Sequence, residues 1–63
     1  MKGITMINGY IIVAYKPETC KKYRIPYPTY AAFCCDAIQH LNPSYEECSF
    51  DNLDELVEWC RNN

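Results

Sequence analysis

The sequence predicts a small α+β domain in which a three-stranded antiparallel meander is followed by two helices packed on one face, in the order βββαα. Two observations favour this class. Short β-rich runs separated by Asn-Gly and Pro turns fill the first part of the chain, and apolar side chains recur at helical spacing in the rest. With 63 residues, the chain is long enough for one such domain, which we expect to span residues 1–63.

The strongest local signal is Asn8-Gly9, which lies between two runs rich in β-branched and aromatic residues. Asn and Gly both adopt the positive φ that a type I′ turn requires, and the twist of this turn matches paired strands. We therefore expect residues 3–7 and 10–15 to form a hairpin in which Ile7 pairs with Tyr10.

A third strand is predicted over residues 21–25. Pro17 breaks the preceding strand and favours a turn, because proline presets φ and cannot donate a backbone hydrogen bond. Polar and apolar residues then alternate, which is typical of a half-buried strand, until Pro26 and Pro28 end it. This strand is expected to complete the meander, with residues 10–15 in the middle.

A first helix is predicted from Thr29, a suitable N-cap, to Asn42-Pro43, where the residue before proline leaves the α region. The prediction rests on one apolar stripe at helical spacing, which consists of Tyr30, Phe33, Cys34, Ala37, Ile38 and Leu41.

A second helix is predicted from an N-cap at Ser49 to Asn62-Asn63. Its apolar stripe consists of Phe50, Leu53, Leu56, Val57 and Cys60. We expect Phe50 and Trp59 to anchor this helix against Phe33 and Leu41 of the first one.

The hairpin register places a second set of apolar side chains on the side of the sheet away from the helices. A patch of this kind, bordered by two cations, exceeds the scattered apolar residues of an ordinary surface. We expect it to meet a second copy in a C2 homodimer or a different protein target, unless the register is in error or a terminal segment folds over it. The predicted partner-binding residues are Ile4, Met6, Ile11, Val13, Tyr15, Lys22 and Arg24.

The charges are strongly segregated along the chain, although the net charge is only −2. Residues 1–33 contain five basic residues and one acidic residue, whereas residues 34–63 contain one basic and seven acidic residues. Such a dipolar surface steers partners, although exposed helix faces also carry charge for solubility alone. The predicted acidic strip, which would imitate phosphate towards a basic protein surface, consists of Glu47, Asp51, Asp54, Glu55 and Glu58.

The five cysteines indicate free thiols in a reducing compartment, because their number is odd, two are adjacent and the first residues contain no export signal. No C-x-x-C or H-x-x-x-H pair is present, so we expect no metal and no cofactor. His40 follows Cys35 by five residues, which separates the two side chains by about 140° on a helix. We therefore do not expect an enzyme or any catalytic residue.

The remaining function class is surface contact. We expect a non-enzymatic cytoplasmic protein that binds another protein, as an inhibitor or adaptor of a larger complex, of the anti-defence type carried by phages and mobile elements. The apolar sheet face and the acidic strip would make the contact, and we expect neither nucleic acid nor a membrane as the main partner. The alternative is a nucleic-acid-associated regulator that uses the basic segment Lys21–Arg24, although a pI near 5.1 and the placement of Tyr23 and Tyr27 opposite Lys22 and Arg24 argue against it.

Overall fold

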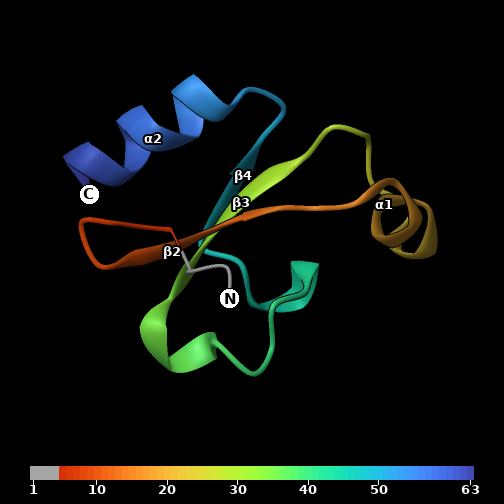
Figure 1. Cartoon of the computed structure of the whole chain (residues 1–63), viewed down its shortest axis with the longest axis horizontal. Coiled ribbons are helices and arrows are strands. Elements are labelled where there is room, and N and C mark those ends of the chain that lie inside the picture. The colour runs from red at the N-terminus through yellow and green to blue at the C-terminus, as the bar shows by residue number, and fades with distance from the viewer. Residues whose placement is uncertain (1–4) are drawn as a thin grey trace.

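A computed structural model describes residues 5–63 of the chain (Figure 1). The described elements are β1 (Met6–Ile7), β2 (Tyr10–Ala14), α1 (Pro17–Tyr23), β3 (Tyr30–Cys34), the 3₁₀ turns η1 (Cys35–Ala37) and η2 (Pro43–Tyr45), β4 (Cys48–Phe50) and α2 (Leu53–Asn62). Within this part of the chain, four strands form one antiparallel sheet in the order β1-β2-β3-β4. The prediction of an α+β fold with an antiparallel sheet and two helices is confirmed, whereas the three-stranded βββαα arrangement is wrong.

The hairpin at Asn8-Gly9 is confirmed. Asn8 and Gly9 have φ values of 52° and 87°, as a type I′ turn requires. Ile7 pairs with Tyr10, and the amide of Ile12 donates to the carbonyl of Thr5 at 2.9 Å. The local turn chemistry therefore sets the register of β2, and with it the face to which each β2 side chain points.

The segment predicted as the third strand is instead the helix α1. Pro17 occupies the first turn, where its missing amide hydrogen costs nothing, and Glu18 lies near the positive end of the helix dipole. Lys21 and Lys22 lie in the last turn, near the negative end. Arg24 ends the helix in the left-handed conformation, with φ 58° and ψ 42°. These end signals favour a helix more strongly than five residues of approximate alternation favour a strand.

The first predicted helix is also wrong, because Tyr30–Cys34 forms the strand β3. This strand pairs with β2 on one side and with β4 on the other. Ala31, Ala32 and Phe33 are each 0% exposed. A short continuous apolar run is typical of a strand buried on both faces, and tertiary context overrides the helix propensity of alanine. Thr29 does not cap a helix, and its hydroxyl donates to the carbonyl of Pro26.

The C-terminal helix is confirmed as α2, although it begins later than predicted. Ser49 lies in β4, and the N-cap is Asn52, whose side chain accepts from the amides of Asp54 and Glu55 at 2.8 and 3.2 Å. Within residues 5–63, no helix has the length and apolar character needed to cross a bilayer.

The sheet carries a separate apolar cluster on each face. The α2 face packs Leu56 and Cys60 of α2 against sheet residues, which are Ile7, Tyr10, Ile12, Tyr30, Ala32, Cys48 and Phe50. The opposite side, here called the loop face, carries Ile11, Val13, Tyr15, Ala31 and Phe33. Cys20 of α1, with Ile25 and Ala37 from the following segments, packs against the loop face. The two helices therefore contribute to clusters on opposite faces of the sheet, and not to one face as predicted. In Figure 1, α1 lies beyond the end of β2, well apart from α2.

This arrangement also changes the contacts of the last helix. Phe33 belongs to the loop face, across the sheet from α2, and Leu41 is 36% exposed in the segment after η1. The partners of α2 are strand residues, because the predicted first helix does not exist. Trp59 of α2 packs edge-on against Tyr10 of β2, with ring centroids 5.2 Å apart.

Both clusters are expected to be essential for folding. A chain of 63 residues has a free energy of unfolding of roughly 3–9 kcal/mol. Phe33→Ala on the loop face should cost about 3–5 kcal/mol, and Leu56→Ala on the α2 face about 2–5 kcal/mol. Each variant should lose most of its cooperative urea transition, whereas Leu53→Ala, at a position 44% exposed, should melt close to the wild type. A normal transition in either core variant would contradict this two-sided core.

Candidate functional site

Two residues of the predicted partner-binding face, Ile11 and Tyr15, are buried within the chain itself. Ile11 is 2% exposed and Tyr15 is 5% exposed, and both pack within the loop-face cluster of the same chain. Val13 is half-buried against this cluster. The prediction that Ile11 and Tyr15 are free for a second chain is therefore wrong. The physical reason is that Cys20, Ile25 and Ala37 cover the face that a three-stranded meander would leave open.

Of the other predicted residues, Met6 pairs with Ile11 and therefore lies on the same face of the sheet as Ile11 and Val13, whereas Lys22 and Arg24 do not lie on a strand. Met6 is 50% exposed on the edge strand β1, and Lys22 and Arg24 are exposed on α1 and at its end. Ile4 lies outside the described residues. A partner role for these side chains stays a prediction, but the apolar patch that motivated a homodimer is largely covered.

The acidic strip is presented by α2 and the residue before its cap. Asp51, Asp54, Glu55 and Glu58 are exposed, and Arg61 is the basic residue in the last turn of this helix. Glu47 is exposed as well but lies before β4, where its carboxylate accepts from the Cys34 thiol at 3.3 Å. The structure thus places four of the five predicted acidic residues on or beside one helix.

The helix is fixed by contacts with the hairpin. The Asn8 side chain donates to the carbonyl of Cys60 at 2.9 Å, and the Tyr10 hydroxyl donates to the carbonyl of Asn63 at 3.3 Å. Leu56 and Cys60 are both 0% exposed beneath the helix. These contacts hold the outer, acidic face of α2 in a defined orientation.

The basic segment is fully on the surface. Lys16, Lys21, Lys22 and Arg24 are all exposed, and α1 buries Cys20 against the loop face. Sequence reasoning placed Tyr23 and Tyr27 in the core, opposite these cations, on the basis of a strand that does not exist. In the structure Tyr23 is 40% exposed and Tyr27 is 62% exposed. The sequence features that indicate the helix α1, and with it the exposure of these rings, are Pro17 at its start and Lys21-Lys22 in its last turn.

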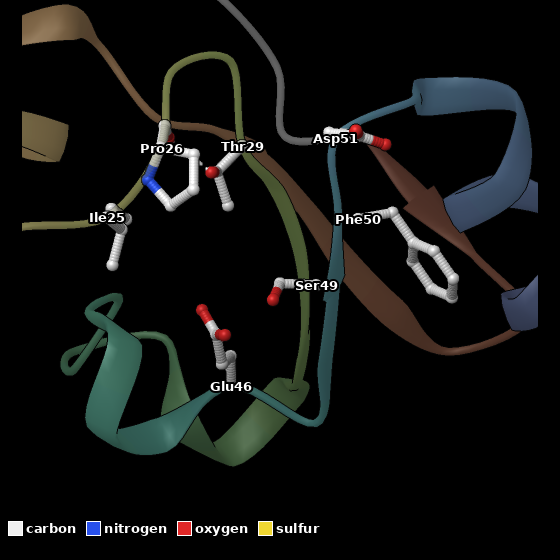
Figure 2. A pocket seen from close by; sticks show the side chains of 7 residues that line it. All are labelled: Ile25, Pro26, Thr29, Glu46, Ser49, Phe50 and Asp51. Carbon is white, nitrogen blue, oxygen red and sulfur yellow. Dashed lines mark hydrogen bonds between the residues drawn. The ribbon is translucent and has the colours of Figure 1, made fainter.

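A pocket of about 180 Å³ lies between residues 25–29 and β4 (Figure 2), and it was not predicted from the sequence. The Glu46 carboxylate and the Ser49 hydroxyl point into it, whereas the side chains of Phe50 and Asp51 point away. The Tyr15 hydroxyl donates to Glu46 Oε2 at 2.9 Å, and burial together with this bond raises the pKa of Tyr15 well above its ordinary value. The pocket is smaller than sites for drug-sized ligands, which are about 300 Å³ or more.

The cysteines are free thiols in three kinds of environment. Cys20 and Cys60 are buried, Cys34 and Cys48 are half-buried, and Cys35 is exposed with its thiol donating to the carbonyl of Gly9. Burial raises the pKa of Cys48 to about 11 and also raises that of Cys60, while the bond to Glu47 raises that of Cys34. A raised pKa keeps a thiol protonated and therefore a poor nucleophile.

His40 stands apart from these thiols and stacks on Tyr45, with ring centroids 4.7 Å apart. Among residues 5–63, no group of three or more His, Cys, Asp or Glu side chains is placed to hold a metal ion.

No family model, curated protein or solved structure matches this chain.

The bond between Tyr15 and Glu46 should contribute measurably to stability. Tyr15→Phe removes the donor while keeping the buried ring, and should lower the free energy of unfolding by about 1–2 kcal/mol in urea titrations. Tyr27→Phe is the matched control, because that ring is largely exposed and its hydroxyl faces water. Equal stability of Tyr15→Phe and the wild type would show that this bond adds no net stability.

The raised pKa of Cys48 predicts a loss of stability in alkali. Above the ordinary thiol pKa of 9.0, the unfolded chain releases a proton that the folded chain retains until about pH 11, so stability falls across this interval. Below pH 9 this group should contribute no pH dependence. Thermal melts between about pH 9 and 11 should show a shallower decline for Cys48→Ala than for the wild type. Identical slopes would mean that Cys48 titrates normally in the folded chain.

Proposed function

We propose that this chain is a small non-enzymatic binding protein whose acidic α2 face contacts a basic surface of a protein partner. The observation that carries the proposal is the two-sided character of α2. Asp54, Glu55 and Glu58 are all exposed on one side of the helix, and Leu56 and Cys60 on the other side are completely buried. A fixed helix that presents carboxylates outward is suited to charge-complementary recognition.

The chemistry of the contact includes an apolar element. Leu53 is 44% exposed at the start of α2, beside Asp54, and Val57 one turn later is half-buried. Leu53 lies about 100° around the helix from Asp54, at the edge of the acidic face, so a partner with lysine or arginine beside an apolar spot would pair the carboxylates and cover Leu53 at that edge. A contact through charge and one apolar side chain suits an inhibitor or adaptor that acts by occupying a surface of a larger complex.

The five free thiols support a reducing compartment such as the cytoplasm for this activity. Two buried thiols and two half-buried thiols act in the packing as small apolar side chains. Their placement requires no disulfide for folding.

The test is a partner-binding comparison with matched charge variants. A tagged chain is used to capture partners, and the captured protein is then purified and titrated against each variant. Glu58→Lys should weaken binding about tenfold at low salt, with most of the change in the association rate. This substitution replaces the repulsion between positions 54 and 58 by an attraction, but it also removes the hydrogen bond that the Glu58 carboxylate accepts from the Asn62 side chain at 3.0 Å. Circular dichroism of the variant should therefore accompany the titration.

Lys22→Glu, on the opposite side of the sheet, is the matched control and should leave the affinity for this partner unchanged. Equal losses in both variants, or binding that resists Glu58→Lys and higher salt, would refute a role for the acidic face.

A further inference from the structure

The surface around α1 combines cations with exposed aromatic rings. Residues 16–24 contain four exposed cations, Lys16, Lys21, Lys22 and Arg24, and one carboxylate, Glu18. Tyr23 and Tyr27 are 40% and 62% exposed, and Tyr27 is the most exposed large apolar side chain among the described residues. We name these four cations and two tyrosines the α1 surface.

The backbone explains why both rings face outward. Cys20 is the residue through which α1 is buried, and its carbonyl accepts from the amide of Ile25 at 3.0 Å. This bond and the left-handed conformation of Arg24 turn the chain so that Ile25 packs against the loop face. Tyr23 and Tyr27, on either side of this turn, remain exposed. Lys22 Nζ lies 5.3 Å from the centre of the Tyr23 ring, so charge and ring belong to one surface.

We propose that the α1 surface binds single-stranded nucleic acid, with its cations on phosphates and its two tyrosine rings stacked on bases. Proteins that bind single strands combine a positive surface with aromatic platforms, because every unpaired base offers a face for stacking. Two exposed rings beside the cations favour a strand with unpaired bases over a duplex, whose bases are already stacked.

The net charge of −2 does not oppose this assignment, because the acidic helix lies across the sheet. The molecule measures 29 × 24 × 23 Å, and charges are screened within about 8 Å at physiological salt. The four cations therefore dominate the charge near α1, where the opposing carboxylates are Glu18 of α1 and Glu46, which lines the pocket beside Ile25 and Pro26. The carboxylates of α2 repel a polyanion and direct it towards the opposite end. This inference is independent of the proposed function, because it concerns the other side of the molecule.

The test is fluorescence anisotropy of labelled oligothymidylate and oligouridylate of about 15 nucleotides. The wild type should bind both with a Kd between about 1 and 100 μM. Four phosphate contacts predict a logarithmic salt slope near −2.8 on single strands, which is about 50-fold weaker binding at 200 mM than at 50 mM salt.

Two sets of variants separate the phosphate contacts from stacking. The pair Lys21→Gln with Lys22→Gln should halve the salt slope to about −1.4. Tyr27→Leu should weaken binding roughly 5-fold or more with the salt slope unchanged, because stacking on one base contributes a factor of this size. Arg61→Gln is the matched control, since it removes an exposed cation from the acidic helix and should change neither quantity.

Three outcomes would overturn the proposal. The first is no binding of either oligomer at low salt, and the second is an effect of Arg61→Gln equal to that of the lysine variants. The third is equal binding of polyglutamate or duplex DNA without any loss in Tyr27→Leu, which would indicate a surface for acidic proteins or for phosphates alone. Circular dichroism of each variant should match the wild type, because all the substituted side chains are exposed.

Discussion

The burial of β3 on both faces is the constraint on which the rest of the structure depends. Ala31, Ala32 and Phe33 are completely buried, and β3 pairs with a strand on each side. A domain of this size buries only about 60% of its unfolded surface, so a strand covered on both faces is an efficient use of few residues. Small alanine side chains let the covering layers approach closely. α2 must then cover one face, and α1 with the segment after β3 must cover the other.

The hairpin and α2 have strong local signals and could be predicted from the sequence, and β3 and β4, which are selected by tertiary contacts, could not. The helix α1 has local end signals as well, but its short alternating pattern favoured a strand instead. The hairpin depends on Asn8-Gly9, which forms its turn independently of the structure of the following residues. α2 has a long apolar stripe and a cap within its own residues. The segment from Tyr30 onward, in contrast, has apolar spacing that suits a helix equally well. It becomes a strand because it forms backbone hydrogen bonds with β2 on one side and β4 on the other. The strand β4 was not predicted, because Ser49 and Phe50 were assigned to the start of the last helix.

The errors in the candidate site follow from these misassignments. With residues 21–25 assigned to a strand and residues 29–42 to a helix on the other face, neither α1 nor the segment after β3 was available to cover Ile11 and Tyr15, so their face was interpreted as an interface with another chain. The same meander required residues 21–25 as a third strand, which placed Tyr23 and Tyr27 in the core. The acidic residues of α2 were placed correctly, because their helix was predicted from its own pattern. The Glu46 pocket joins segments distant in the sequence, and no local pattern indicates it.

Helix stability explains only part of the charge arrangement. Asp54 and Glu55 at the start of α2, Arg61 at its end and the two lysines at the end of α1 all complement the helix dipoles. Lys16 and Glu58 do not. Lys16 caps the positive end of α1, and Glu58 follows Asp54 by one turn, where like charges cost a few tenths of a kcal/mol. Glu58 has one stabilising contact within the helix, because its carboxylate accepts from the Asn62 side chain at 3.0 Å. Each of these two residues nevertheless adds to the charge already dominant on its side of the sheet, which is the direction that the proposed recognition of an oppositely charged partner requires.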